Sequence, residues 1–543
     1  MYLSPSPRAK SEEIRSIPVF LLRGLTVAAL SSAVCCTALK SRPGAARVDS
    51  ALQSAQQSLE ARMAGRDTAA GKRTHCDASL GTLLTALQDH GSPRTWTGTQ
   101  SIEGWTVTFS GDASGMKSIP PSWCDRITAV IPGKSLPRLE RRVSTGGEGL
   151  PVVMVQKVSD GKKDPQLPPH GRRLAATLTA DFAAGKRVTL TFHNTRNVDS
   201  APVRGEVRAL ASDLSAPIAQ GMSRRYLSKF ALAGLLRPDA HLKDAGIYTP
   251  ELYDPKKIPL VLIHGLESAP HIWANVMNEV TADPVLRRRY QVWYYLYPTG
   301  LTVHVAAARL RKSLTDARDF YDPQHRSAAM QQMILAGHSM GGLLTRMQVI
   351  DSGEEIYRAF WTRPMKELPL SAETRDVVFR TLYFKHQPFV ARAIFIAVPH
   401  RGSDIAELSI VRFLSRLIQP TKFITGILRE MTSVARYAVN PDLHRFRDLG
   451  SRATEGLSPK HPLLHALDRR PILVPYHNII GVFDPLHFRR PAEKSSDGVV
   501  AWKSSFLPGA QSTATVPYFH TCVECPEVAK EILRILRSLQ GRP

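Results

Sequence analysis

A six-residue stretch, Gly-His-Ser-Met-Gly-Gly at residues 337–342, constrains the fold of this chain more than any other feature. It follows a short apolar segment at 333–336 and opens a segment with helically spaced apolar residues. Gly337 and Gly341 flank Ser339 at two residues on each side, where any side chain would collide across a sharp turn. The stretch therefore predicts a strained strand–turn–helix unit that points the Ser339 hydroxyl outward at the top of a sheet.

The C-terminal half of the chain alternates apolar strands with helices, which is the pattern of a parallel sheet with helices on both faces. Strands are expected at 259–263, 291–297, 333–336, 393–398, 477–482 and 512–516, with a helix at 341–352 and a last helix at 526–539. Two helical insertions, expected to form lids, interrupt this order at about 354–390 and 403–470. We therefore expect an α/β domain over 246–543 with a mostly parallel, doubly wound sheet.

The first forty residues have the pattern of an export segment. Basic residues precede an apolar run over 24–34 that is too short to span a bilayer comfortably, and the run ends before Cys35 and Cys36. A simple N-terminal helix is the alternative. The expectation is an exported protein, periplasmic or anchored to a membrane as a lipoprotein.

The region between the export segment and the α/β domain divides into two parts. Residues 41–75 are rich in Ala, Gln, Ser and Arg and are typical of a linker, which could be helical. Residues 76–245 contain β-branched runs separated by turn residues, at 150–158, 174–182, 187–194 and 206–211. They predict a small β-rich accessory domain whose role the sequence leaves open.

Four cysteines lie beyond the export segment. In an oxidising compartment Cys76 with Cys124, and Cys522 with Cys525, would be the natural disulfide pairs. Cys522 and Cys525 also lie close to His520, but two thiols and one imidazole are one ligand short of a closed zinc site. We expect no metal and no organic cofactor.

The chain is strongly basic, with 71 Lys and Arg against 47 Asp and Glu and a net charge of +24. No basic stretch interleaves with aromatic residues as in nucleic-acid modules, so nucleic acid is not an expected partner. The segment 408–429 carries four cations and no acidic residue, and its apolar residues recur at near-helical spacing. It could lie on an anionic membrane surface, which is then a candidate partner, or pack as a cap against the sheet.

A serine nucleophile needs a base, and the base needs a carboxylate that orients it. His520 follows the last expected strand and precedes the last helix, where this arrangement presents a histidine. Asp484, directly after the strand at 477–482, and Asp497, in a tight turn 23 residues before His520, are the candidate acids. We favour Asp497, which gives the chain order serine, aspartate, histidine.

Acyl transfer also needs hydrogen-bond donors for the developing oxyanion. The backbone N–H of Met340, just after the serine, is one expected donor. The loop after the first strand should supply the second, from the N–H of Leu266, because Gly265 lets the backbone bend close. His264 is interpreted as a side chain that supports this loop.

Residues 255–540 resemble bacterial α/β-hydrolases of the group that includes true lipases, lecithin-cholesterol-acyltransferase-like enzymes and glycosylphosphatidylinositol-inositol-deacylase-like proteins. The matching residues are 262–266 (Leu-Ile-His-Gly-Leu), 337–342, 398–403 (Val-Pro-His-Arg-Gly-Ser), 496–500 (Ser-Asp-Gly-Val-Val) and His520. The resemblance implies that Asp497 is the acid of the triad and that a lid follows residue 403.

The expected activity is hydrolysis of a carboxylic ester, of a lipid or another acyl compound, through an acyl-enzyme intermediate. An acyltransferase or an amidase would use the same triad. A binding or scaffolding protein on a retired hydrolase fold is a further alternative, against which the intact set of candidate residues argues.

Overall fold

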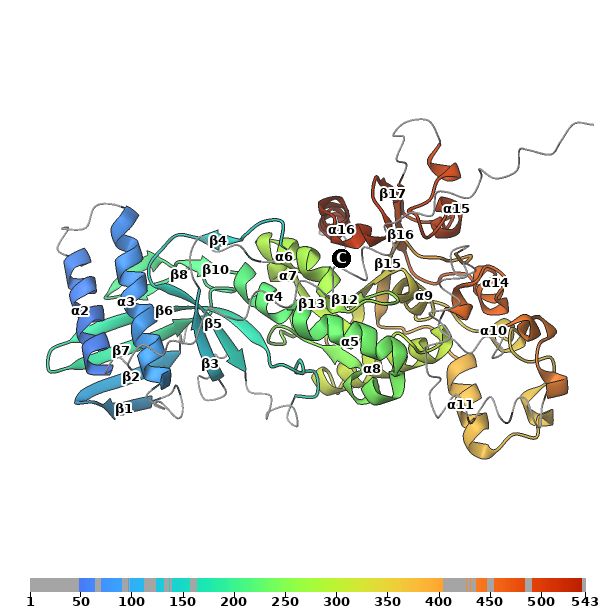
Figure 1. The fold of residues 1–543 in the computed structure, drawn as a ribbon, viewed down its shortest axis with the longest axis horizontal. Coiled ribbons are helices and arrows are strands. Elements are labelled where there is room, and N and C mark those ends of the chain that lie inside the picture. Colours follow the sequence, from blue (N-terminus) through green and yellow to red (C-terminus); the bar gives the residue numbers. More distant parts are fainter. Residues whose placement is uncertain are drawn as a thin grey trace, which may run out of the picture.

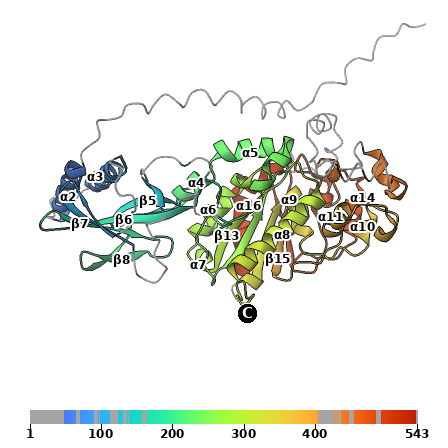
Figure 2. The ribbon, with the colours of Figure 1, turned by 90° about the horizontal axis from the view of Figure 1, so that it is seen from below.

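The computed structural model describes residues 48–63, 70–89, 96, 98–111, 124–130, 136, 139–156, 164–403, 426, 430, 436–446, 454–483 and 491–539. The expected export segment at 1–40, most of the basic segment 408–429 and Asp484 lie outside these ranges. In Figures 1 and 2 the accessory domain and the α/β domain lie side by side along the long axis of the molecule.

The accessory domain is built on a six-stranded sheet with the order β1-β2-β7-β6-β5-β3. Its strands are β1 (Gly98–Ile102), β2 (Trp105–Gly111), β3 (Cys124–Ala129), β5 (Leu150–Gln156), β6 (Arg173–Ala183) and β7 (Arg187–His193). β2 and β7 pair in parallel, and the other neighbours are antiparallel. Two small ribbons accompany the sheet: β4 (Ser144–Thr145) with β10 (Ser212–Asp213), and β8 (Ser200–Val203) with β9 (Glu206–Ala209).

Two helices, α2 (Val48–Met63) and α3 (Ala70–Asp89), pack with this sheet (Figure 1). Leu52 of α2 and Leu84 of α3 are buried in one apolar cluster with the sheet residues Val107 and Leu190. Residues 48–63, which we expected within a linker, therefore belong to the accessory domain. Burial of a leucine side chain contributes about 1.5–3 kcal/mol, which explains why this segment is ordered against the sheet.

The α/β domain contains a seven-stranded sheet with the order β11-β13-β12-β14-β15-β16-β17. Its strands are β11 (Gly246–Tyr248), β12 (Ile258–Ile263), β13 (Tyr290–Leu296), β14 (Met333–His338), β15 (Val390–Ile396), β16 (Tyr476–Gly481) and β17 (Ser512–Val516). Only the edge strand β11 runs antiparallel to its neighbour, and the other pairs are parallel. Connected parallel strands need crossovers, and helices supply them.

Side chains on each strand alternate between two buried faces. On β12, Val261 and Ile263 belong to the core beneath α8 (Val303–Tyr321), α9 (Met340–Arg346) and α11 (Ala372–Leu382). Leu260 and Leu262 belong to the core beneath α6 (Ala274–Ala282) and α16 (Pro526–Ser538). The sheet is therefore doubly wound, and the expected α/β class is confirmed.

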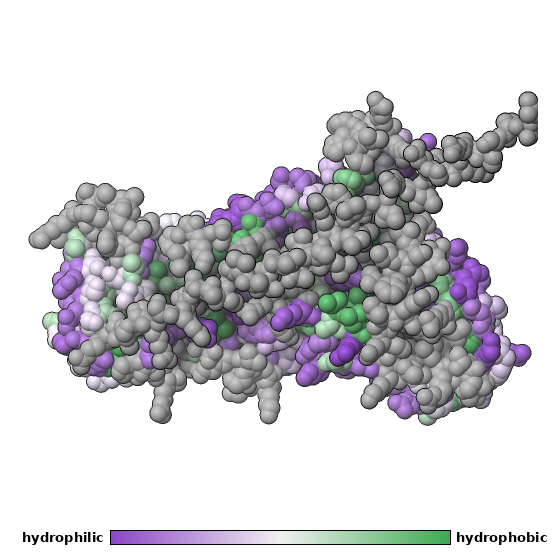
Figure 3. Space-filling model, viewed as in Figure 1, coloured by the Kyte–Doolittle hydropathy of each residue, from purple (hydrophilic) through white to green (hydrophobic). Residues whose placement is uncertain are grey.

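Residues just before the α/β domain also pack on it. α4 (Ser215–Gly221) and α5 (Arg224–Leu236) contribute Ile218, Leu227 and Phe230 to the same core as α6 and α16. We had placed residues 215–236 in the β-rich domain, but α5 packs on the α/β domain. α4 contacts both domains, because its Ala216 packs with Val153 of β5. On the face in Figure 3 an apolar patch lies near α5, where Leu232 is 58% exposed.

Shorter elements complete the described chain. They are the helices α7 (Leu286–Arg289), α10 (Glu355–Arg358), α14 (Pro462–Asp468) and α15 (Trp502–Ser505), and the 3-10 turns Pro238–Asp244, Pro270–Trp273, Met330–Gln332, Met365–Glu367, Arg436–Ala438, Pro441–Arg445, Glu455–Leu457, Ala492–Lys494 and His520–Glu524. Within the described ranges, no helix combines the length and the apolar character needed to cross a bilayer.

Candidate active site

Ser339 occupies the turn between β14 and α9 with φ 53° and ψ −126°, a conformation that a non-glycine residue adopts only at a cost of about 1–3 kcal/mol. The turn is held from outside, because Ser339 N–H donates to the carbonyl of Ile396 at 3.0 Å. Its crowding explains the flanking glycines: a Cβ at Gly341 would lie 2.4 Å from the His264 carbonyl oxygen, and one at Gly337 would lie 2.4 Å from Thr345 Oγ1.

The structure brings Ser339, His520 and Asp497 together in one hydrogen-bonded series. His520 Nε2 lies 2.8 Å from Ser339 Oγ, and His520 Nδ1 lies 2.7 Å from Asp497 Oδ2. A carboxylate can only accept, so Nδ1 carries the imidazole proton and Nε2 is free to accept the serine proton. This is the arrangement in which a histidine can act as a base toward a serine hydroxyl.

Asp497 is buried, with 1% of its surface exposed, and its second carboxylate oxygen is also occupied. Oδ1 accepts the backbone N–H groups of Val499 at 2.8 Å and Val500 at 2.6 Å. These two bonds compensate the burial of the carboxylate and fix the direction in which Oδ2 points.

Asp497 lies next to the end of β16 although 15 residues of sequence lie between it and Gly481. Phe483 N–H donates to the carbonyl of Ser496 at 2.7 Å, so the chain returns to the strand end immediately before Asp497. Gly481 leaves room for it, because a Cβ there would lie 3.0 Å from the Asp497 Cβ. The alternative acid, Asp484, begins the intervening segment and lies outside the described residues.

His338, the residue before the serine in the turn, contacts the candidate base. Its Nε2 lies 2.8 Å from the backbone carbonyl of His520, and a carbonyl only accepts, so Nε2 carries the proton. Burial, and then the neighbouring His520, lower the pKa of His338 to about 3, which keeps the ring neutral. Apart from the presence of a histidine beside the serine, no feature of the sequence indicates this role.

The loop after β12 lies against the turn that carries Ser339. A Cβ at Gly265 would lie 2.8 Å from the Ser339 Cβ, so only glycine permits this approach, and Leu266 follows directly. Met340 is the first residue of α9. The two expected oxyanion donors thus belong to the two segments that meet at Ser339.

His264 is fully buried beneath this loop and stacks on Tyr297, with ring centroids 4.5 Å apart. Tyr297 O–H donates to the His264 carbonyl at 2.9 Å, and His264 Nδ1 lies 3.1 Å from the Gly265 carbonyl. Burial lowers the pKa of His264 to about 4. Among the described residues no hydrogen bond joins this ring to Ser339, His520 or Asp497, and Tyr297 is a supporting residue that the sequence did not single out.

The expected Cys522–Cys525 disulfide is wrong, because both thiols are free and buried. Cys525 N–H donates to the Cys522 carbonyl at 2.9 Å in a tight turn, and both side chains pack into the core beneath α6 and α16. Burial raises the pKa of both thiols. The Cys76 side chain lies outside the described part of the chain, so its pairing with Cys124 stays a prediction.

The described residues contain no group of three or more His, Cys, Asp or Glu side chains placed to hold a metal ion. His520, the imidazole two residues before Cys522, already contacts Ser339 and Asp497.

Comparisons with known proteins give structural likeness only. No family model and no curated protein matches the chain. Among solved structures, a Bacillus licheniformis lipase, BlEst2, in its mature form is 15% identical, covers 53% of this chain and 94% of its own, and has a TM-score of 0.31. EstA from Clostridium botulinum is 13% identical, with 58% and 97% covered and a TM-score of 0.31. A hydrolase from Pseudomonas aeruginosa is 17% identical, with 54% and 93% covered and a TM-score of 0.28.

The chain therefore combines an α/β domain with a Ser339–His520–Asp497 hydrogen-bonded series at the carboxyl ends of three parallel strands, β14, β16 and β17. Ligands and reactive side chains of open α/β sheets gather at that edge.

Proposed function

We propose that this chain is a serine hydrolase of the α/β-hydrolase superfamily that cleaves carboxylic esters. The observation that carries the proposal is the series of two short hydrogen bonds, 2.8 Å and 2.7 Å, that joins Ser339 to His520 and His520 to Asp497. A serine held in a strained turn and facing an oriented imidazole has little structural purpose other than nucleophilic catalysis.

In the proposed reaction Ser339 Oγ attacks the ester carbonyl while His520 Nε2 takes its proton. Asp497 stabilises the imidazolium, and the N–H groups of Leu266 and Met340 stabilise the oxyanion. His520 then gives the proton to the departing alcohol, which leaves an acyl group on Ser339. Water attacks this acyl-enzyme with His520 again as the base, and release of the acid restores the serine.

The proposal is tested by labelling with a fluorophosphonate, which reacts only with an activated serine. The wild-type chain should label, and Ser339→Ala should not label and should lose activity by roughly 10³-fold or more. Ser268→Ala is the matched control, since this nearby serine takes no part in the series, and it should label normally. An unlabelled wild-type chain that is folded would favour the retired scaffold, and a labelled Ser339→Ala chain would place the nucleophile elsewhere.

The acceptor of the acyl group separates a hydrolase from an acyltransferase. We propose water as the physiological acceptor. The ratio of free acid to transferred ester, measured with a p-nitrophenyl ester and increasing glycerol, tests this choice. Acid should dominate at every glycerol concentration, and a product that is mainly glyceryl ester at low glycerol would favour the acyltransferase. Turnover of the matching anilide at a comparable rate would favour the amidase.

The substrate class proposed is a lipid or other acyl ester, met by an exported protein at a membrane surface. The basic segment 408–429 supports this, because each cation near an anionic surface contributes about 1 kcal/mol. Changing Arg412, Arg416 and Lys422 to Glu should weaken activity on anionic vesicles in a salt-dependent way and leave a soluble ester nearly unaffected. Equal losses on both substrates, with a lower melting temperature, would mean that the segment is a structural cap.

A further inference from the structure

A cavity of about 860 Å³ lies at the junction of the accessory and α/β domains, and none of the candidate catalytic residues lines it. β6 and the turn after β7 line it from the accessory domain, whereas α4, α6, β13 and the segment 250–257 line it from the α/β domain. Its volume falls in the range of sites that enclose a whole small molecule. Because both domains supply walls, the site exists only in the two-domain chain.

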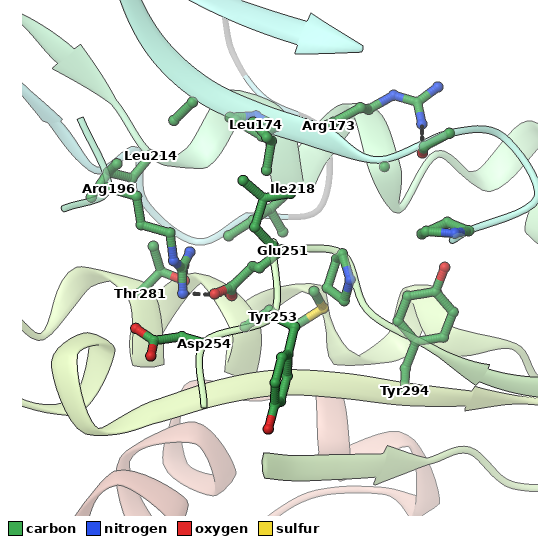
Figure 4. A pocket seen from close by; sticks show the side chains of 18 of the residues that line it. Arg173, Leu174, Arg196, Leu214, Ile218, Glu251, Tyr253, Asp254, Thr281 and Tyr294 are labelled. Atoms are coloured by element: carbon green, nitrogen blue, oxygen red, sulfur yellow. Dashed lines mark hydrogen bonds and ion pairs between the residues drawn. The ribbon is translucent and has the colours of Figure 1, made fainter. Parts of the chain in front are cut away.

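The middle of the cavity is apolar. Leu174 of β6 and Ile218 of α4 lie together in its centre, with Leu214 beside them (Figure 4). Met277 and Leu296 are among the further apolar residues that line it. A surface of this kind gains stability by covering an apolar chain, at roughly 25 cal/mol per Å² buried.

One end of the cavity carries buried charge (Figure 4). Arg196 pairs with Glu251 at 2.5 Å, and the two side chains are only 14% and 13% exposed. The Arg196 atom in this pair is Nη2, Nη1 reaches Thr281 at 3.3 Å, and Nε has no hydrogen-bond partner among the described residues. Lys257 also lines the cavity, is 7% exposed, and interacts electrostatically with both Arg196 and Glu251. Its Nζ has neither a hydrogen-bond nor an ion-pair partner in the described part of the chain.

The positive charge at the cavity exceeds the negative charge. Four cationic side chains line it, Arg173, Arg196, Lys256 and Lys257, against two carboxylates, Glu251 and Asp254. Burial lowers the pKa of Arg196 and of Lys257, which means that the surrounding carboxylates do not fully offset the loss of water around these cations. A ligand anion would supply the missing compensation and an acceptor for Lys257 Nζ.

We propose that this cavity binds a single-chain amphiphile with an anionic head group, a carboxylate or a phosphate. The head group lies against Arg196 and Lys257, and the chain lies along Leu174, Leu214 and Ile218. The proposal does not rest on the proposed esterase reaction. It gives the accessory domain a role, since β6 supplies part of the apolar lining and the turn after β7 supplies Arg196.

Isothermal titration calorimetry on the full chain tests the proposal with laurate, dodecyl phosphate and dodecyltrimethylammonium, each below its micelle-forming concentration. Laurate, dodecyl phosphate or both should bind, and the relative affinity of the two identifies the head group. The cationic amphiphile should bind at least tenfold more weakly. Equal binding of the cation, or no binding of either anion, overturns the proposal.

Two variants locate the site away from the candidate active site. Lys257→Met should raise the dissociation constant for the bound anion roughly tenfold or more, because it removes a charged donor without leaving a buried carboxylate unpaired. Ile218→Trp should abolish binding by filling the centre of the cavity. Lys243→Met, at an exposed lysine outside the cavity, should change nothing.

The melting temperature of each variant shows whether it is folded, and Lys257→Met alone decides the question if Ile218→Trp does not fold. An unchanged dissociation constant in folded Lys257→Met or Ile218→Trp would place the amphiphile elsewhere, for instance at the triad, and overturn the proposal. Loss of fluorophosphonate labelling has no bearing on this result, so the two proposals fail separately.

Discussion

Replacing Asp497 with Asn should abolish most of the catalytic activity without unfolding the chain, and the hydrogen bonds around the carboxylate show why. Oδ1 accepts two backbone N–H groups, from Val499 at 2.8 Å and Val500 at 2.6 Å. The amide NH₂ of an asparagine cannot face these donors, so the asparagine carbonyl must take the place of Oδ1. The NH₂ group then points at His520 Nδ1.

That orientation forces the wrong tautomer on His520. An NH₂ group donates to Nδ1, so the imidazole proton moves to Nε2, which now donates to Ser339 Oγ and cannot accept its proton. A tautomer change of this kind costs about 10⁴-fold in kcat. At 1.36 kcal/mol for each factor of ten, the loss corresponds to about 5.5 kcal/mol of activation free energy.

The measurement is the steady-state hydrolysis of a soluble p-nitrophenyl ester together with the melting temperature. Asp497→Asn should melt close to the wild type, whereas Asp497→Ala should melt lower, because it leaves two backbone N–H groups without a partner at about 1–3 kcal/mol each. Asp484→Asn should retain most of the activity. A folded Asp497→Asn chain within tenfold of wild-type kcat would refute the reasoning, and a collapse of Asp484→Asn instead would identify that residue as the acid.

Three further outcomes follow from the same contacts. Ser339→Gly should abolish activity but raise the free energy of unfolding by about 1–3 kcal/mol, because glycine relieves the strain of the positive φ. Ser339→Ala should not gain stability. Equal free energies of unfolding for the two variants would mean that the turn is not strained. Gly342→Ala should lower the free energy of unfolding by roughly 1–3 kcal/mol, because its Cβ would lie 2.0 Å from Val398 Cγ2. Adding Val398→Ala in the same chain should restore part of this loss, and chemical denaturation measures both changes. The pKa of His264 is lowered to about 4 and that of His338 to about 3, below about 6.5 in the unfolded chain, so their contribution to stability is complete above pH 6.5 and decreases as the pH falls. At pH 5 the loss should be about 2 kcal/mol per ring in urea unfolding, and an unchanged free energy between pH 7.5 and 5 would contradict it.

The strands of the α/β sheet were predictable because each is a short apolar run between turn residues. Strands β12 to β17 begin within three residues of the expected positions, and β17 (Ser512–Val516) coincides with its prediction. The helix after the serine was expected to reach residue 352 but ends at Arg346. Its apolar spacing continues beyond that point because residues 347–350 are buried as turns in the same core, and spacing alone does not distinguish the two.

The accessory domain was harder to predict because its signals are weak. β1 (Gly98–Ile102) is exposed along most of its length and carries no apolar alternation, so nothing in its sequence indicates a strand. α2 (Val48–Met63) is rich in Ala, Gln and Ser and resembled a linker. Its Leu52 is nevertheless fully buried, because the sheet supplies the apolar surface that a linker would lack.

In the candidate site, too, the residues set by local sequence were predictable and those set by tertiary contacts were not. Ser339 and its glycines belong to a local pattern, and local sterics explain them. The choice between Asp484 and Asp497 depends on the backbone hydrogen bond from Phe483 N–H to the Ser496 carbonyl, a tertiary contact that brings Asp497 to the end of β16. The contact from His338 to the His520 carbonyl joins residues 182 positions apart, and no local pattern encodes it.

That contact explains how the base keeps its place in a turn of only five residues, His520–Glu524. The backbone of His520 is held on both sides: its N–H donates to the Asp497 carbonyl at 2.9 Å, and its carbonyl accepts from His338 Nε2 at 2.8 Å. The side chain is held separately by Ser339 and by Asp497. The ring therefore has its position and its tautomer fixed before any ester binds, so none of the binding energy is needed to orient it. The cost is a strained serine and a buried neutral histidine, which is a reason to expect that variants of Ser339 or His338 can gain stability as they lose activity.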